Sequence, residues 1–226
     1  MSNEIIIISP EFGDGRGGVA DYTSRVVEEW RGQWPLRFLV PSGDYPIPDG
    51  AESFARNSNA LRAKLPSSGG KLLVQYSAYG FDRHGFPRWL LRALTDWKHE
   101  TRGRLVVMFH EIWTFWPRWN RNRFVQTLHR RAIGQLVSAA DATFTSTAGQ
   151  GEHLRAVGAR SIEVLPVGTN IRVSHEAVAR KEAGVAVLFG LQASRVKALE
   201  LMKADLCALF ASACLTKIIT VGGGNT

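Results

Sequence analysis

Cysteine is scarce in this sequence: Cys207 and Cys214 are the only two among 226 residues. Two thiols are too few for a disulfide-stabilised scaffold or a four-thiolate zinc site, so we expect a reducing, cytoplasmic setting. Long apolar stretches are missing as well. The longest purely aliphatic run, Ile5–Ile8, is far shorter than the roughly 20 residues that a membrane-spanning helix needs. Acidic Glu4, with no basic stretch ahead of an apolar segment, argues against a signal peptide.

Several catalytic patterns are also missing. The sequence has neither the G-x-S-x-G element of serine hydrolases nor a G-x-x-x-x-G-K-[ST] phosphate loop. His110 and Glu111 are adjacent, but no second histidine follows His110 at the four-residue spacing of zinc-binding helices. We therefore predict no metal site.

Positive charge is abundant, with 28 Lys and Arg against 20 Asp and Glu, a net charge of +8. From Arg83 to Arg131 there are eleven basic and three acidic residues, so this segment accounts for the whole excess. It also holds five of the seven tryptophans. Arginine combined with tryptophan suits an anionic partner that has an apolar part, such as lipid headgroups or nucleic acid. A solvated helix face with core tryptophans is the equally weighted alternative.

Short apolar runs alternate with longer helical patterns along the first three quarters of the chain. The expected strands are residues 4–8, 36–40, 72–75, 105–109, 142–146 and 162–165. The expected helices are residues 19–31, 57–64, 87–101, 121–139 and 149–157, the last one capped by Thr147 and stopped by Gly158. Continuous apolar strands that alternate with helices predict an α/β fold with a Rossmann-like, doubly wound parallel sheet.

We expect two domains. Residues 1–171 form the first, residues 172–184 a polar linker, and residues 185–226 the start of a second Rossmann-like lobe. The second lobe begins with a strand at residues 185–189, one helix at 195–213 and a strand at 217–221. One β-α-β unit cannot bury both faces of a sheet, so we expect this lobe to be incomplete.

The loop after the first strand is rich in glycine. Gly13, Gly15 and Gly18 match the dinucleotide pattern G-x-G-x-x-G between a strand and a helix. The pattern also needs an acidic residue at the end of the second strand, where the sequence has Pro41 instead and Asp44 comes late. The loop therefore favours contact with the diphosphate of another nucleotide over NAD binding, and a glycine turn without a ligand is the third reading.

His110 follows the fourth expected strand, at the sheet edge where open α/β folds bind ligands. An imidazole there can donate a hydrogen bond to a substrate oxygen, and Glu111 could orient the ring; a purely structural role is equally open. Tyr76 and Tyr79 follow the third strand and could line a pocket, although Tyr76 could equally belong to the core. We interpret the other histidines, His129 among them, as structural.

Five short segments together resemble one family, the retaining glycosyltransferases of the GT-B fold that form the large family-four group. The matching segments are Gly17-Gly18-Val19-Ala20, His110-Glu111, residues 141–147 with Glu152-His153-Leu154, residues 164–171, and residues 188–197 with Arg195 and Lys197. Each is short, but their order and spacing span nearly the whole chain.

The resemblance implies transfer of a hexose, with retention, from a nucleotide sugar to a saccharide or lipid-linked acceptor in polysaccharide biosynthesis. It implies that the first domain binds the acceptor and the second the donor, with His110 at the transferred sugar. Gly17 and Gly18 would approach the donor diphosphate, and Arg195 and Lys197 would neutralise it without a metal or other cofactor. The family's paired glutamates would lie beyond Thr226, so we expect weak or no activity from this chain.

Enzymes of this type often dock on the inner membrane leaflet through a basic acceptor domain, so an anionic membrane surface is a further expected partner of residues 83–131. Two other functional classes remain as alternatives. One is an NAD(P)-dependent oxidoreductase domain, and the other is a basic Rossmann module that binds nucleic acid, a partner that we do not expect.

Overall fold

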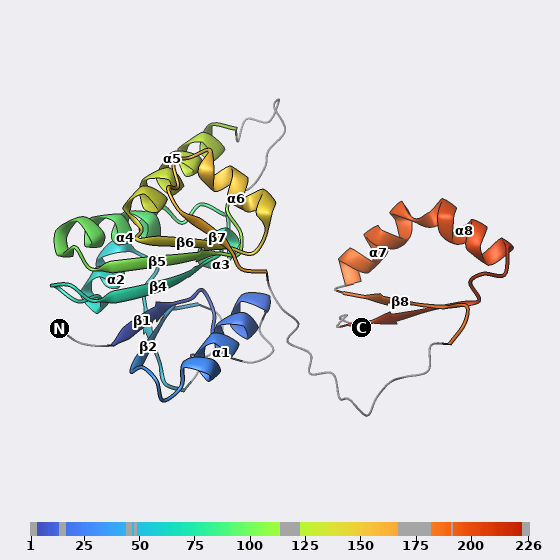
Figure 1. Ribbon diagram of the computed structural model, residues 1–226, viewed down its shortest axis with the longest axis horizontal. Coiled ribbons are helices and arrows are strands. Elements are labelled where there is room, and N and C mark those ends of the chain that lie inside the picture. Colours follow the sequence, from blue (N-terminus) through green and yellow to red (C-terminus); the bar gives the residue numbers. More distant parts are fainter. Residues whose placement is uncertain are drawn as a thin grey trace. The chain divides into compact units, whose positions relative to one another are not determined.

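The computed structural model describes residues 4–13, 17–43, 47, 49–113, 123–166, 182–190 and 192–222 (Figure 1). The chain divides into two compact units, Met1–Ile171 and Arg172–Thr226. Most of the expected linker, residues 172–181, lies outside the described residues.

The first unit is built on a seven-stranded, all-parallel sheet with the order β3-β2-β1-β4-β5-β6-β7 (Figure 1). The strands are β1 (Ile5–Ile8), β2 (Leu36–Pro41), β3 (Ala51–Phe54), β4 (Lys71–Tyr76), β5 (Arg104–Phe109), β6 (Ala142–Thr145) and β7 (Ile162–Val164). The chain runs outward from β1 to β3 and then returns to place β4 on the other side of β1. The predicted Rossmann-like, doubly wound fold is therefore confirmed for this unit.

Helices cover both faces of this sheet. They are α1 (Gly18–Trp30), α2 (Ser58–Lys64), α3 (Ala78–Phe81), α4 (Arg88–Thr101), α5 (Arg123–Ala139) and α6 (Ala148–Arg155). All five predicted helices are present, within two residues at each end, and α3 is an addition. The Thr147 hydroxyl accepts a hydrogen bond from Gln150 N (3.3 Å), and Gly158 adopts φ 105° after α6. The predicted cap and stop of this helix are thus confirmed.

Alternation along the strands divides the core into two clusters. Ile7 and Leu73 face α1 and pack with Val27 in the smaller cluster. Their neighbours Ile6 and Leu72 point to the opposite face, where α2, α4, α5 and α6 contribute to the larger cluster. Because successive side chains of a strand point to opposite faces, continuous apolar strands fill both layers at once.

The described part of the second unit contains one parallel strand pair, β8 (Val185–Phe189) and β9 (Lys217–Val221), and two helices. The prediction of one helix over residues 195–213 is wrong. Helix α7 (Gln192–Leu201) ends before Met202, whose φ of −94° and ψ of 6° leave the helical range, and α8 (Lys203–Ala211) follows. Val187 and Phe189 remain 63% and 70% exposed, because two strands and the two helices do not enclose both faces of a sheet.

Candidate functional site

The candidate site lies at the carboxyl edge of the first unit's sheet. Strands β1, β4 and β5 are adjacent and parallel, so the loops that follow them meet at this edge. The order of connections reverses between β1 and β4, which makes this the point at which open α/β sheets bind ligands. His110 N donates to Tyr76 O (2.9 Å), so His110 extends the pairing of β5 with β4 by one residue.

The imidazole of His110 is partly buried and is held from the neighbouring strand. Its Nε2 lies 2.7 Å from Oε1 of Gln75, a side chain that is only 1% exposed. The backbone of His110 is fixed separately, because Gln150 Nε2 donates to His110 O (3.0 Å) and Thr145 Oγ1 donates to Gln150 Oε1 (2.6 Å). With Gln75 as acceptor, Nε2 carries the proton and Nδ1 of the neutral ring is left as an acceptor.

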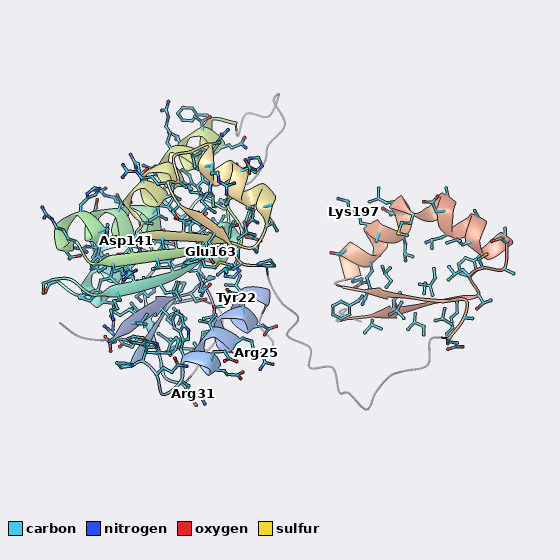
Figure 2. All side chains as sticks on the ribbon, in the orientation of Figure 1. Tyr22, Arg25, Arg31, Asp141, Glu163 and Lys197 are labelled. Atoms are coloured by element: carbon cyan, nitrogen blue, oxygen red, sulfur yellow. The ribbon has the colours of Figure 1, made fainter. Side chains whose placement is uncertain are left out.

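Burial lowers the pKa of His110 from 6.5 to about 4, and the charge of Glu111 opposes this shift without cancelling it. The ring is therefore neutral at pH 7. Tyr22 of α1, labelled in Figure 2, contributes to the burial, because its ring meets the imidazole edge-on with centroids 4.9 Å apart. Burial also raises the pKa of Tyr22. Because its one N–H is donated to Gln75, the neutral imidazole offers a ligand an acceptor, Nδ1, without a net charge.

Replacement of Glu111 by glutamine is expected to lower the pKa of His110 further, since the mutation removes the one charge that raises it. The imidazole carbon shifts in an NMR titration of the purified protein would measure this pKa. Glu163→Gln, a substitution of an exposed residue of β7 (Figure 2), is the matched control and should leave the pKa of His110 unchanged. A rise in this pKa in the Glu111→Gln variant would contradict the assignment.

Glu111 itself is exposed, and its carboxylate is hydrogen-bonded to Ser77 rather than to His110. We expected it to orient the imidazole, but its Oε2 accepts a hydrogen bond from Ser77 Oγ (2.8 Å), and Gln75 is the side chain that holds the ring. Ser77 Oγ also accepts a hydrogen bond from Gly80 N (3.2 Å) as the cap of α3. Ser77 therefore fixes a carboxylate and the start of a helix at the same edge.

The two tyrosines have different environments. Tyr76 is 0% exposed, and its hydroxyl lies 2.7 Å from Nε2 of His129. Its expected place in a pocket wall is therefore corrected in favour of the core, since it lies between β4 and the helices that cover this face. Tyr79 is 47% exposed on α3. The next residue, Gly80, is so close to the loop after β1 that a Cβ there would lie 2.7 Å from Pro10 Cβ.

The glycine-rich loop brings a carboxylate to the N-terminus of α1. Gly17 is the N-cap residue and provides no side-chain cap, and a Cβ at this position would lie 2.5 Å from Glu11 Oε1. At Gly18 a Cβ would meet nothing within 4 Å. Gly15 lies outside the described residues. The Glu11 carboxylate is the end of a flexible side chain, so it could move away from a Cβ at Gly17, and the partial positive charge at this end of α1 faces this carboxylate.

In the second unit, Arg195 and Lys197 lie on α7. Arg195 Nη1 donates to Gly222 O (2.8 Å), which holds the guanidinium at the carboxyl end of β9. Lys197 is exposed (Figure 2). Residues two apart on a helix point in different directions, so the two cations do not face each other across α7. The structure therefore ties Arg195 to the end of the sheet and leaves Lys197 apart from it.

Sequence reasoning missed three residues of the site: Tyr22, Gln75 and Gln150. The first two contact the ring of His110, and the third fixes its backbone. Gln75 interrupts the apolar run 72–76, which ends with Tyr76. A polar side chain within a buried strand was the signal that could have identified it. Tyr22 and Gln150 carry no such signal, because their positions depend on how α1 and α6 pack against the sheet.

No protein-family model matches this chain, and no curated protein matches it. Within the part of the chain that the structure describes, no three His, Cys, Asp or Glu side chains are grouped as a metal site would require. None of the described helices is both long and apolar enough to cross a membrane.

Proposed function

We propose that this chain belongs to a retaining glycosyltransferase that transfers a hexose from a nucleotide sugar to a saccharide or lipid-linked acceptor. The observation that carries the proposal is the neutral imidazole of His110 at the carboxyl edge of a Rossmann-like sheet, held by Gln75 and covered by Tyr22. Sugar hydroxyls both donate and accept hydrogen bonds. Nδ1 of the neutral ring can accept a hydrogen bond from such a hydroxyl, which an imidazolium ion cannot do.

Glu111 of the first unit and Arg195 of the second unit each have a role in this proposal. The exposed carboxylate of Glu111, oriented by Ser77, accepts a hydrogen bond from an acceptor hydroxyl. Arg195, held by Gly222 O, stabilises the negative charge that develops on the leaving diphosphate. The chemistry needs no metal, because a fixed guanidinium supplies the positive charge.

In this proposal the loop at Gly17 and Gly18 can bind the donor diphosphate only after Glu11 has moved. The carboxylate of Glu11 lies against Gly17, where an incoming diphosphate would meet the N-terminus of α1. Two anions repel each other at such a short distance, so donor binding through this loop requires Glu11 to move aside. Gly18, where a side chain would meet nothing, is the position at which a phosphate can approach the backbone.

A dinucleotide-dependent oxidoreductase is the second candidate, and the strand order is the observation that favours it. The sheet has the β3-β2-β1-β4-β5-β6 arrangement of dinucleotide-binding domains. However, β2 ends at Pro41, and the described residues that follow it directly, Ser42 and Gly43, carry no carboxylate for the ribose hydroxyls. Nucleic-acid binding is a third candidate and depends on the basic charge alone.

Ligand-induced thermal stabilisation would test the proposal. A ligand that binds the native state at 100 times its Kd raises the free energy of unfolding by about 2.7 kcal/mol. We expect at least one of UDP-glucose, GDP-mannose and ADP-glucose to raise the Tm of the chain, and NAD and oligonucleotides to leave it unchanged. In the His110→Ala variant, the nucleotide sugar that stabilises the wild type should bind about tenfold more weakly, because one hydrogen bond is lost.

The matched control is His84→Ala, because His84 is largely exposed and lies in the same unit outside the site. This variant should respond to nucleotide sugars as the wild type does. Stabilisation by NAD alone, or by none of the nucleotide sugars at millimolar concentration, would reject the glycosyltransferase proposal. Equal effects of His84→Ala and His110→Ala would reject the role of His110.

A further inference from the structure

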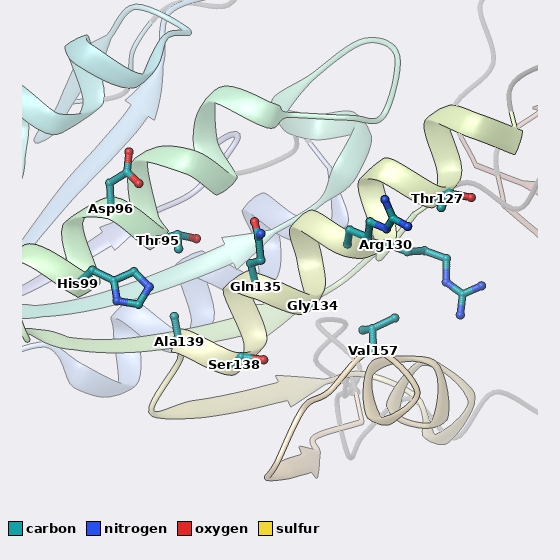
Figure 3. A pocket seen from close by; sticks show the side chains of 11 residues that line it. Thr95, Asp96, His99, Thr127, Arg130, Gly134, Gln135, Ser138, Ala139 and Val157 are labelled. Carbon is teal, nitrogen blue, oxygen red and sulfur yellow. The ribbon is translucent and has the colours of Figure 1, made fainter.

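Two adjoining cavities lie on the helical face of the first unit, on α4 and α5, away from the residues assigned to the candidate site. One has a volume of about 940 Å³ (Figure 3) and the other of about 770 Å³. Four residues line both, namely Thr95, Asp96, Arg131 and Gln135. The two cavities therefore form one groove, which we call the α4–α5 groove.

The α4–α5 groove carries guanidinium groups in excess of carboxylates. Its acidic residues are already engaged: Asp96 lies 3.5 Å from Arg92 Nε, and Asp82 accepts a hydrogen bond from His84 N (2.8 Å). Among the described residues, neither Arg88 nor Arg131 has an ion-pair partner, and both side chains are exposed. With four arginines against two carboxylates among its lining residues, the groove has a net positive charge and defined walls.

Arg130 adds to this charge. Its guanidinium carbon lies 5.3 Å from the centre of the Trp113 ring, a cation–π contact that orients the side chain but does not neutralise it. Gln135 and Ser138 contribute an amide and a hydroxyl to the same wall (Figure 3). Guanidinium groups together with neutral donors are the groups that bind phosphate oxygens, because the planar guanidinium can donate two parallel hydrogen bonds to one phosphate.

The arrangement of these groups favours more than one phosphate. Arg88 lies at the start of α4 and lines the second cavity, and Arg92, one turn further along, is paired with Asp96. Arg131 faces them from α5 and lines both cavities. A ligand with a single phosphate could satisfy only one of these positions, whereas a chain of linked phosphates could follow the groove.

Single-stranded nucleic acid and a flat membrane surface fit the groove less well than a chain of linked phosphates does. Its two aromatic residues are partly buried and already packed: Phe86 lies against His129 (4.8 Å), and Trp89 against Phe54 (5.8 Å) and Phe81 (6.1 Å). Phe86 also meets the guanidinium of Arg88, whose carbon lies 5.9 Å from the ring centre, so these engaged rings are less suited to the base stacking that single-stranded nucleic acids use. The cationic groups line a concave surface, which suits an entering ligand rather than a planar bilayer.

We propose that the α4–α5 groove binds a soluble, multiply phosphorylated ligand through Arg88, Arg130 and Arg131. This site is separate from the candidate glycosyl-transfer site, with which it shares no residue. Its test can therefore fail while the proposed function stands, and the reverse also holds.

Isothermal titration with sodium tripolyphosphate would test the site on the full chain. We expect binding by the wild type that weakens as the salt concentration rises, because the contacts are electrostatic. The double variant Arg88→Gln and Arg131→Gln should bind about tenfold more weakly or worse, since it loses two charge-assisted contacts. Both side chains are exposed, so we expect the variant to fold normally, as circular dichroism would verify.

The matched control is the double variant Arg31→Gln and Arg160→Gln, which has the same net charge and loses two exposed arginines outside the groove. It should bind tripolyphosphate within about twofold of the wild type. Equal weakening in both double variants, or no binding at millimolar tripolyphosphate, would overturn the proposal. So would binding to phosphatidic acid vesicles but not to tripolyphosphate, or binding to a single-stranded oligonucleotide more than about tenfold tighter than to tripolyphosphate.

Discussion

Replacement of Gly103 by alanine is expected to destabilise the first unit by about 3 kcal/mol, the upper part of the range for overpacked cores. A Cβ at this position would lie 2.4 Å from Cη2 of Trp97 and 2.9 Å from Gly69 O. The indole cannot move aside easily, because it is 0% exposed and its Nε1 donates to Pro66 O (2.9 Å). One methyl group therefore displaces either the largest buried side chain or the turn that receives its hydrogen bond.

Urea unfolding followed by tryptophan fluorescence would measure this change. All seven tryptophans lie in the first unit, so the signal reports on that unit alone. Gly149→Ala is the matched control. Gly149 lies inside α6 with nothing within 4 Å of an added Cβ, and alanine should stabilise this helix by up to about 1 kcal/mol. If the free energy of unfolding of Gly103→Ala is within about 1 kcal/mol of the wild-type value, the indole of Trp97 is not confined as described.

Strands buried on both faces were the clearest to predict from the sequence, although the edge strand β7 was predicted as well. The runs at β1 and β4 are continuous in Ile, Leu and Val because one face meets α1 and the other meets the larger core. Such runs need no tertiary information to be recognised. The helices between them were predictable for a similar reason, since apolar spacing and caps such as Thr147 are local signals.

The elements that escaped prediction are those whose stability depends on a neighbour. Strand β3 reads Ala-Glu-Ser-Phe and lies at the sheet edge, where it pairs only with β2. Its one charged residue, Glu52, is held by Arg37 of β2 (2.6 Å) and Lys64 of α2 (3.1 Å). No periodicity in four residues reveals a strand of this kind. The ion pairs that accompany it form only after β2 and α2 are in place.

In the candidate site, too, one residue could be predicted from local sequence and its partners could not. The position of His110 followed from its place after an apolar strand, because the ends of parallel strands define the ligand edge. The ring's partner, Gln75, lies 35 positions earlier in the chain, and only the register of β4 with β5 brings it close. The sequence therefore indicates which residue carries the chemistry, whereas the structure shows which residues hold it.

Acidification is expected to destabilise the first unit well before its carboxylates titrate. Burial lowers the pKa of His129, as it does that of His110, from 6.5 to about 4. Since both histidines are neutral in the fold, the unfolded chain takes up protons first as the pH falls. Stability is then full above pH 6.5 and decreases until the folded-state pKa near 4 is reached. For His129, which is 2% exposed, the loss amounts to ~3 kcal/mol.

The surroundings of His129 explain why it stays neutral. Its Nε2 lies 2.7 Å from the hydroxyl of Tyr76, and the ring of Phe86 covers it with centroids 4.8 Å apart. The charge of Asp82 favours protonation, but burial outweighs it. Burial also raises the pKa of Tyr76, so the phenol keeps its proton throughout the acid range. An imidazolium ion here would be a charge in the core without an ionised partner in contact.

His129→Gln separates this contribution from the rest, because an amide can share a hydrogen bond with Tyr76 and does not titrate. We expect the loss of unfolding free energy between pH 7 and 4.5 to be smaller by ~2 kcal/mol in this variant, as measured by urea titrations at each pH. His99→Gln, at an exposed position of α4, is the control and should retain the full loss. The paired carboxylate Glu52 has a pKa lowered to about 2, so its contribution is lost only below pH 4.5 and falls outside this window. An identical pH dependence in wild type and His129→Gln would mean that the pKa of His129 is the same in the folded and the unfolded chain, and this would contradict the neutral, buried imidazole described here.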